Sequence, residues 1–376
     1  MTISKTFCPA KWDELTVNLS ANYVYSCCKS TPIKITKKED IEKALNDQRN
    51  NLLNGIQDPA CNYCWQVENT GNSSLRKEYL KDFDYKNINQ YINNKTKLKK
   101  IEINLGNECN FQCVYCNPKF SSQWESDVKN KPYKTYSDRF FYSLNEKNTN
   151  VISDSIDWLT EYKSIEHLEI IGGEPLLNKN FFKILNCVEC KQIGFVTNLS
   201  CKTFAPIDNI FSLSKKYEKI IFGISIDSTE KNAEFSRYGM DFDLMLKNIE
   251  YVITNSPPQV EIRFCTLMTS ITIRDFDNIY KLIEKFYNLK PKNVKWHISY
   301  CNFPLIFTMN TLPDNYKFQI LESISKISNK EYIYGLDILA SVISKSKFNK
   351  TLYGQMKYFL EEFSSRKNIA IPVILD

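Results

Sequence analysis

Three cysteines lie close together in the first third of the chain. Cys109, Cys113 and Cys116 occur in the run Asn107-Glu-Cys-Asn-Phe-Gln-Cys-Val-Tyr-Cys116, a C-x3-C-x2-C spacing that follows the apolar segment 101–105. Closely spaced cysteines hold iron–sulfur clusters, and a four-iron cluster normally takes four thiolates. Because this run supplies three, one iron is left to bind an exogenous chelating molecule and pass an electron to it. The spacing therefore predicts a 4Fe-4S cluster that takes part in chemistry.

Two other interpretations of the three cysteines stay open. Zinc sites also use C-x2-C pairs, but they usually add a second pair of cysteines or histidines a dozen or so residues later, and none follows Cys116. Single buried cysteines act as small hydrophobic residues, yet three on one short segment are too many for that role.

Further polar residues follow apolar segments of the chain. Gly172 and Gly173 permit unusual backbone angles and let a ligand approach closely, and Glu174 offers a carboxylate to an ammonium group. A plain surface turn is the alternative for these three. Ser225 and Asp227 are two positions apart, so on one strand both point to the same face. Hydroxyl groups of a ribose suit such a pair.

Strand and helix patterns alternate along the middle of the chain. Such alternation predicts an α/β fold with parallel strands, right-handed crossovers and ligand sites at the carboxyl ends of the strands. We expect strands near 100–105, 166–171, 192–197, 219–226, 258–267 and 293–299, and helices near 152–162, 181–187, 242–253 and 277–286.

Most of the chain from Lys100 to Ser299 resembles the radical S-adenosylmethionine (radical SAM) family. The resemblance rests on the C-x3-C-x-aromatic-C motif with Tyr115, and on three strand ends in the family's order, His167-Leu-Glu-Ile-Ile-Gly-Gly-Glu-Pro175, Phe195-Val-Thr-Asn198 and Gly223-Ile-Ser-Ile-Asp227. It implies a partial (β/α)6 TIM-like barrel with S-adenosylmethionine (SAM) bound to the open iron. The cleaved cofactor would yield a 5'-deoxyadenosyl radical that removes hydrogen from a substrate.

The resemblance also implies which residues contact SAM. The GGEP stretch would hold the amino group of its methionine part, and Arg237 would pair with the carboxylate, a role that suits a fixed fork of donors. A solvated helix charge remains the alternative for Arg237, strand-end caps for Thr197 and Asn198, and core packing for Tyr115. The full set implied for SAM is Tyr115, Gly172, Gly173, Glu174, Thr197, Asn198, Ser225, Asp227 and Arg237.

A second group of cysteines lies in the first 96 residues. A tight C-x2-C pair with two more distant cysteines is how one chain commonly surrounds a metal centre. The cysteines are Cys8, the adjacent pair Cys27 and Cys28, and the pair Cys61 and Cys64.

This N-terminal segment resembles the "twitch" module that carries an auxiliary cluster in some radical SAM enzymes. The pair Cys61-x2-Cys64 is followed by Glu68, Gly71, Ser74 and Arg76, as in that module. In most such enzymes the module follows the barrel, whereas here it precedes it. We therefore expect a second iron–sulfur cluster on Cys8, one of Cys27 and Cys28, Cys61 and Cys64, with zinc as the alternative metal.

The sequence predicts three regions. Residues 1–96 form the twitch module, residues 97–308 the partial barrel and residues 309–376 a mainly helical C-terminal extension. Within the barrel, residues 117–150 form a long loop with Tyr133, Tyr136, Phe140, Phe141 and Tyr142, and Ser122 with Glu125 resembles a capping box at the start of a helix. A substrate lid and a peripheral packing helix are both open for this loop.

Composition narrows the class of protein. The chain has 49 basic and 43 acidic residues, and the small positive excess is spread along it, so nucleic-acid binding is not indicated. No segment has the length of a membrane span, and the first residues lack the apolar core of a secretion signal. We expect a cytoplasmic enzyme with no membrane partner. Its 13 cysteines are then metal ligands or free thiols, because the cytosol is reducing.

The family resemblance implies an enzyme that needs a low-potential electron donor such as flavodoxin or ferredoxin. Its substrate would be a peptide or a small metabolite, and the auxiliary cluster would accept an electron or anchor the substrate. Two other classes stay open. One is a cluster-bearing redox sensor or scaffold, and the other is a radical SAM enzyme that modifies nucleic acid.

Overall fold

A computed structural model of the chain describes residues 3–19, 23–34, 39–69, 71, 73–93, 98–134 and 165–372. The chain divides into two compact units, which are described separately. The first contains residues 1–106, 146–172 and 179–194, and the second contains residues 107–145, 173–178 and 195–376. The helix expected at 152–162 and the loop residues Tyr136, Phe140, Phe141 and Tyr142 lie outside the described residues. The three predicted regions remain a prediction.

The structure confirms all six strands that the sequence predicts, and three of the four helices. The strands are β4 (Lys100–Asn104), β6 (Ile165–Ile171), β7 (Cys190–Thr197), β8 (Lys219–Ser225), β10 (Val260–Met268) and β11 (Val294–Tyr300). The helices are α7 (Lys179–Cys187), α10 (Phe242–Asn255) and α11 (Phe276–Leu289).

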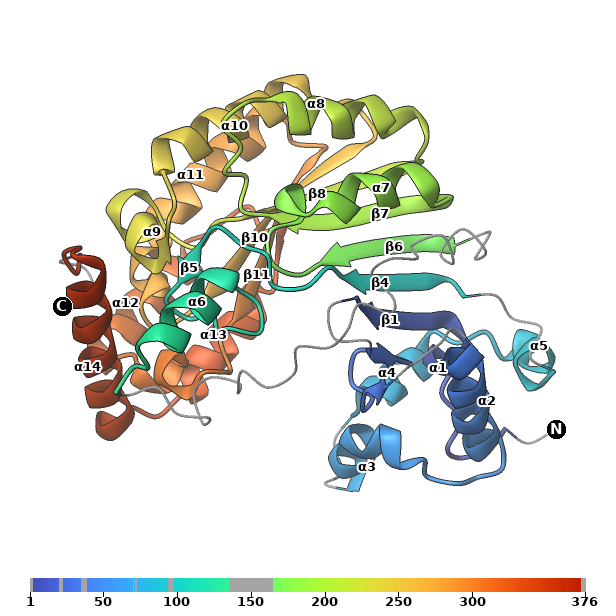
Figure 1. The fold of residues 1–376 in the computed structure, drawn as a ribbon. Helices are drawn as coiled ribbons and strands as arrows, with labels where there is room; N and C mark the ends of the chain where they lie inside the picture. The colour runs from blue at the N-terminus through green and yellow to red at the C-terminus, as the bar shows by residue number, and fades with distance from the viewer. Residues whose placement is uncertain are drawn as a thin grey trace. The chain divides into compact units, whose positions relative to one another are not determined.

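The first unit contains a mixed sheet. β4 is parallel to β6 on one side and to β1 on the other, and β1 continues into an antiparallel β1–β2–β3 meander. The local sequence pattern does not predict that β1 extends the parallel strands. The remaining elements of this unit are α1 (Ala10–Asp13), β1 (Glu14–Asn18), β2 (Tyr23–Tyr25), β3 (Ile33–Lys34), α2 (Glu39–Leu53), α3 (Asn62–Asn69), α4 (Leu75–Lys81) and α5 (Ile88–Ile92). Figure 1 labels β1 and the five helices.

The second unit contains parallel strands in the order β8–β10–β11–β12, with α10 and α11 lying along one side (Figure 1). On β10, Ile262 and Phe264 are fully buried while Arg263 and Cys265 between them are partly exposed, the alternation of a strand with two different faces. The other elements are β5 (Gln112–Cys113), α6 (Ser122–Asn130), α8 (Ala205–Ser212), α9 (Glu230–Ser236), β9 (Arg237–Tyr238), α12 (Asp314–Ser325), β12 (Ile333–Tyr334), α13 (Leu336–Lys345) and α14 (Lys350–Lys367).

Both units thus contribute to an α/β fold whose strands are mostly parallel.

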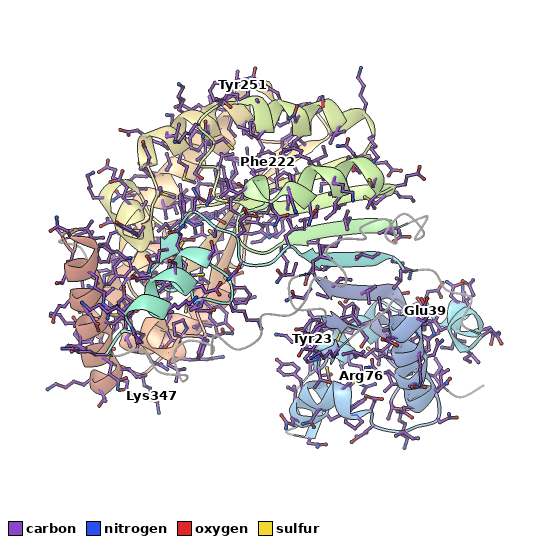
Figure 2. All side chains as sticks on the ribbon, viewed as in Figure 1. Tyr23, Glu39, Arg76, Phe222, Tyr251 and Lys347 are labelled. Carbon is purple, nitrogen blue, oxygen red and sulfur yellow. The ribbon has the colours of Figure 1, made fainter. Side chains whose placement is uncertain are left out.

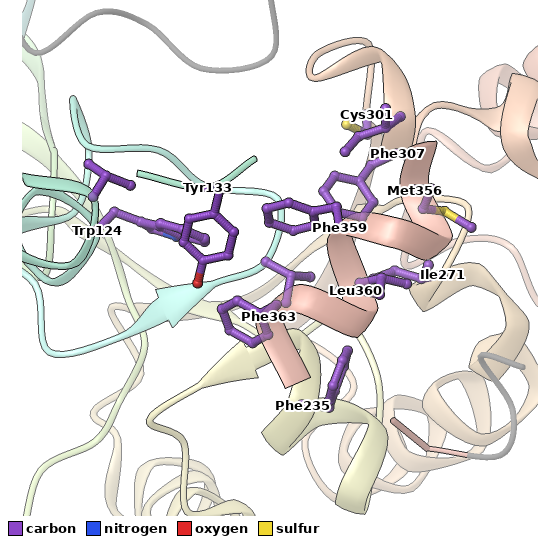
Figure 3. Packing of buried hydrophobic residues seen from close by; sticks show 13 residues of the cluster. Trp124, Tyr133, Phe235, Ile271, Cys301, Phe307, Met356, Phe359, Leu360 and Phe363 are labelled. Carbon is purple, nitrogen blue, oxygen red and sulfur yellow. The ribbon is translucent and has the colours of Figure 1, made fainter. Parts of the chain in front are cut away.

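A buried aromatic cluster in the second unit joins α14 to the segment that follows the three cysteines (Figure 3). Phe359 and Phe363 of α14 face Trp124 of α6, with ring centroids 6.2 and 5.8 Å apart. Asn349 is the N-cap of helix α14, because its side chain accepts a hydrogen bond from the Leu352 amide, and Asn368 is the C-cap, in the left-handed conformation.

Candidate functional site

The three cysteines of the C-x3-C-x2-C motif lie on one loop of the second unit. Cys113 is in the short strand β5, which pairs with β9 so that Cys113 stands opposite Arg237. The amide of Cys116 donates to the Cys113 carbonyl at 2.9 Å, which turns the chain tightly between the two thiols. The amide of Phe111 points at the Cys109 sulfur, 3.5 Å away. This arrangement brings all three thiols to the same end of the loop.

Burial raises the pKa of each of these thiols, that of Cys109 to about 11. Negative charge on one thiol raises the pKa of the others, so the three are close enough to interact. The Arg237 guanidinium acts in the opposite direction on all three. Cys113 is buried, and Cys109 and Cys116 are partly exposed. A group of thiols beside a fixed positive charge suits thiolates that bind metal.

Helix α6 supports this loop from behind. The Trp124 indole donates to the Cys113 carbonyl at 2.8 Å, and the Ser121 hydroxyl donates to the Phe111 carbonyl at 2.7 Å. Ser121 is also the N-cap, since its side chain accepts from the Trp124 amide. The predicted capping residue, Ser122, was therefore wrong by one position. Its hydroxyl instead donates to the carbonyl of Cys109 at 3.1 Å, because that carbonyl lies within its reach.

The GGEP stretch adopts a backbone that glycine permits. Gly172 and Gly173 have φ of +98° and +52°, and a Cβ on Gly173 would lie 2.2 Å from the carbonyl oxygen of Glu108. The Glu174 amide donates to that same carbonyl at 2.7 Å. The glycines therefore let this stretch lie directly against the cysteine loop.

Glu174 is a buried carboxylate with three donors. It accepts from the Thr197 hydroxyl at 2.5 Å, from the Asn198 amide at 2.6 Å and from the Leu176 amide at 3.1 Å. Burial raises its pKa, and these hydrogen bonds act against that rise. Since a carboxylate offers about four acceptor positions, one remains for a further donor such as an ammonium group.

Tyr115, Asp227 and Arg237 form a buried triad. The Tyr115 hydroxyl donates to Asp227, and Arg237 Nη1 lies 2.7 Å from the same carboxylate oxygen and 3.0 Å from the Tyr115 oxygen. The other oxygen of Asp227 accepts from the Leu267 amide at 2.7 Å. Burial opposes the charge on Arg237, but the neighbouring Tyr115, Cys113 and Asp227 raise its pKa well above the ordinary value.

One donor in this triad is unused. Among the described residues, Arg237 Nε is buried and has no hydrogen-bond partner. A buried donor without a partner is costly, and in a native structure it commonly points to a ligand. The residues present therefore fit an anionic group placed beside the three thiols.

The structure brings most of the predicted SAM contacts together around the cysteine loop. Asn198 extends the group, since its side chain donates to Asn110 at 2.8 Å and Asn110 in turn donates to Ser200 at 2.8 Å. Ser225 is the last residue of β8 and is partly exposed, and Asp227 lies two residues beyond the strand. Asn110, Ser200 and Trp124 are not among the residues predicted from the sequence. Of the three, only Asn110 carries a sequence signal, its position between two of the cysteines.

A second pocket gathers four of the N-terminal cysteines, all within the first unit. Cys8, Cys27, Cys61 and Cys64 line it and are buried, whereas the neighbouring Cys28 is exposed. Burial raises the pKa of Cys8 to about 12 and also raises that of Cys61. The fold thus separates the two adjacent cysteines that the sequence left as alternatives.

The polar residues after the Cys61–Cys64 pair hold this pocket together. Arg76 of α4 makes a 2.6 Å ion pair with Glu68 of α3, the helix that carries Cys64, and the Ser74 hydroxyl donates to the same carboxylate at 2.5 Å. Figure 2 labels Arg76 within the first unit. Its guanidinium also donates to the carbonyl of Phe7, next to Cys8, at 3.0 Å. One buried side chain therefore ties together the segments that carry Cys8 and Cys64.

Within the described ranges, no group of three or more His, Cys, Asp or Glu side chains is arranged to hold a single metal ion. The thiolates of a four-iron cluster bind different irons and do not need to meet at one point. In the same part of the chain, none of the helices has the length and apolar character needed to cross a membrane.

Comparison with known proteins matches the central part of the chain to one protein family. Residues 103–283 match the model of the radical SAM superfamily. The chain therefore contains a radical SAM superfamily domain, with that family's α/β fold and mostly parallel sheet. Such a domain implies a 4Fe-4S cluster and SAM as cofactors.

The curated relatives share a quarter of their aligned residues with this chain. GTP 3',8-cyclases from two strains of Staphylococcus epidermidis are 25% identical over 170 residues, which are 42% of this chain. The match spans 43% of the length of these relatives. It therefore covers less than half of either protein.

Similar solved structures include SuiB from Streptococcus suis bound to S-adenosylmethionine, at 12% identity and a TM-score of 0.42 over 89% of this chain and 72% of SuiB. Another is anSMEcpe with bound AdoMet, at 18% identity and a TM-score of 0.40 over 60% of this chain and 59% of that one. With TM-scores below 0.5, these likenesses support no functional conclusion.

Proposed function

We propose that this protein is a radical SAM enzyme that reductively cleaves SAM and removes a hydrogen atom from a substrate. One observation carries the proposal. Within the radical SAM domain, Arg237 of β9 stands opposite Cys113 of the cysteine loop, and its Nε is buried with no hydrogen-bond partner among the described residues. The cysteine loop and β9 would thus supply cluster ligands and an anion-binding group at the same place.

Different residues of this chain would bind the cluster and the charged groups of SAM. Cys109, Cys113 and Cys116 would hold the cluster, Glu174 the ammonium group of SAM and Arg237 its carboxylate. When bound there, the cluster and SAM supply a 5'-deoxyadenosyl radical, which takes hydrogen from the substrate. The protein's part is to fix the positions of the two charged partners, since Glu174 is held by three donors and Arg237 by Asp227.

We also propose that the N-terminal pocket holds an auxiliary iron–sulfur cluster on Cys8, Cys27, Cys61 and Cys64. The burial of these four thiols in one pocket supports this ligand set, and the exposure of Cys28 supports leaving it out. The twitch assignment of residues 1–96 rests on the same cysteines together with the Glu68–Arg76 pair. This cluster would accept an electron from the substrate radical or anchor the substrate.

The substrate class stays broad, a peptide or a small molecule. The relatives named GTP 3',8-cyclase act on a nucleotide, as their name says, but the shared part is less than half of their length. A flavodoxin or ferredoxin in the cytoplasm would deliver the electron.

Anaerobically reconstituted protein with dithionite should convert SAM to 5'-deoxyadenosine. Cys113→Ala should reduce this product to the background without protein, because the cluster loses a ligand. Cys187→Ala, at a partly exposed cysteine of α7, is the matched control and should keep the activity. Undiminished cleavage by Cys113→Ala, measured by chromatography, would show that this loop does not hold the cluster.

A further inference from the structure

A lysine is buried in the N-terminal cysteine pocket. The Lys11 side chain lines the pocket with Cys8, Cys27, Cys61 and Cys64, and Lys11 is 1% exposed. Lysine is almost never fully buried unless it has a partner of opposite charge. Its position in α1 directly follows the Cys8-Pro9-Ala10 segment, so the fold brings it into the pocket together with Cys8.

The ammonium group of Lys11 is held in a defined position. It donates to the Ser26 hydroxyl at 2.7 Å, and Ser26 in turn donates to Gln48 at 2.6 Å. The ammonium nitrogen lies 3.5 Å from the Cys27 sulfur. Ser26 and Gln48 are both buried, so this chain of hydrogen bonds aims the ammonium at the thiol.

Among the described residues, no carboxylate forms an ion pair with Lys11. Besides burial, the neighbouring groups with the largest effect on its charge are Cys27, Cys61 and Cys8. The other buried cation of the pocket, Arg76, is paired with Glu68. Burying an ammonium group without a counter-charge costs several kcal/mol. Four neutral thiols carry no negative charge. The pocket therefore lacks a counter-charge for the Lys11 ammonium.

A four-iron cluster with four thiolate ligands supplies that charge. Its net charge is negative, and it becomes more negative when the cluster takes up an electron. A fixed cation that donates to a ligand sulfur stabilises the reduced form more than the oxidised one, so it raises the reduction potential. In this scheme Lys11 stays protonated in both the oxidised and the reduced form of the cluster. Reduction therefore transfers one electron and no proton.

We propose that Lys11 is a positioning residue that donates to the Cys27 sulfur of the auxiliary cluster and sets the potential of this cluster for accepting electrons. The inference rests on the auxiliary cluster proposed above. Lys11 binds no iron and contacts no substrate in this role. It determines how readily the cluster accepts an electron.

The test uses a protein in which the auxiliary cluster is the only one. In the background Cys109→Ala, Cys113→Ala, Cys116→Ala, the midpoint potential is measured by redox titration followed by electron paramagnetic resonance. Lys11→Met keeps a similar volume and removes the charge. We expect the reduced-to-oxidised ratio at a fixed potential to fall at least tenfold, about 59 mV to the negative side for a one-electron couple.

Lys29→Met is the matched control. Lys29 also lines the pocket, but it is exposed and its ammonium lies 5.2 Å from the Tyr63 ring centroid. We expect no shift from this substitution. If Lys11→Met does not fold, Ser26→Ala replaces it, since loss of the hydroxyl releases the ammonium and should move the potential in the same direction by a smaller amount.

The outcomes separate the two proposals. An auxiliary cluster with acid-labile sulfide and an unchanged potential in Lys11→Met would overturn the role of Lys11 and leave the cluster assignment standing. Equal shifts in Lys11→Met and Lys29→Met would show a general charge effect and also overturn it. A background protein without iron and sulfide would overturn the auxiliary cluster, and the role of Lys11 with it.

Discussion

Glu174 combines two tasks that the sequence presented as alternatives. As a turn residue it caps the short helix after Pro175, because its carboxylate accepts from the Leu176 amide. The same carboxylate accepts from Thr197, the last residue of β7, and from Asn198, which follows that strand. A surface turn would leave the carboxylate in solvent, whereas here it is buried beside the cysteine loop.

We therefore expect Glu174→Gln to weaken SAM binding by about 2–5 kcal/mol, since one partner of a buried charged contact loses its charge. Isothermal calorimetry on the reconstituted protein measures the effect, and iron content should stay near normal. Glu108→Gln, at an exposed neighbouring carboxylate, is the control. An unchanged SAM affinity in Glu174→Gln would show that Glu174 only shapes the turn and does not bind SAM.

His297 of β11 predicts a pH dependence of stability. Burial, and then the charge of Arg263, lower its pKa from 6.5 to about 4. Between these values the unfolded chain binds more protons than the folded one, so stability falls as pH drops from 6.5 towards 4 and the contribution is fully present above 6.5. Urea unfolding at several pH values should show this loss, and His297→Gln should reduce it.

The chain has only two histidines, so the titration of His297 can be followed directly. His167 lies 2.7 Å from Glu169 through one ring nitrogen and 2.9 Å from Gln192 through the other, which gives it a different environment. The proton resonances of the His297 ring should not move until the pH approaches 4. A midpoint near 6.5 would contradict the prediction.

At the scale of elements, α14 and α6 together hold the cysteine loop. Trp124 donates to the Cys113 carbonyl on one side and packs on Phe359 and Phe363 on the other. Two further contacts connect these elements, a 3.2 Å ion pair between Lys367 and Asp127 and a bond from Gln112 to the same Asp127. Helix α14 thus acts on the cysteine loop through a single layer of residues.

Phe363→Ala should destabilise the second unit by about 3–5 kcal/mol, the usual cost of removing a buried phenylalanine side chain. Urea unfolding measures this loss. Phe318→Ala on α12 is the control, because Phe318 is 75% exposed and its removal should cost less than about 0.5 kcal/mol. Equal losses in the two variants would mean that α14 is not a support for this core.

The sequence predicted single strands and helices better than the contacts between distant segments, for physical reasons. Strands such as β10 show the apolar alternation of a two-faced strand, and α10 and α11 carry one apolar stripe, so local patterns located them. The pairing of β1 with β4 depends on contacts between segments far apart in the chain, which no local pattern records. The same holds for the Tyr115–Asp227–Arg237 triad, where each residue was selected but their mutual bonds were not.

At the scale of the whole molecule, two separate groups of cysteines predict two separate pools of iron. Substitution of Cys109, Cys113 and Cys116 by Ala should leave about half of the iron and sulfide, and Cys61→Ala with Cys64→Ala should remove the other half. Cys28→Ser should leave both pools intact, because this cysteine is exposed. Iron and acid-labile sulfide assays measure each pool.

The second variant should still cleave SAM but should no longer turn over substrate. Zinc without sulfide in the first variant would instead make the N-terminal pocket a structural metal site. Such a result would remove the electron-accepting role of the pocket and leave the radical SAM domain unaffected.

The contact between α14 and the cysteine loop has a consequence for biosynthesis. Arg366 donates to the carbonyl of Lys131, a residue 235 positions earlier in the chain. At ribosomal rates of roughly 5–20 residues per second, the cysteine loop leaves the ribosome roughly 10–50 seconds before its supporting helix does. During that interval the loop lacks the layer that holds Trp124 in place. Delivery of iron and sulfide to this loop is therefore expected after α14 has been synthesised and has packed on Trp124, not before.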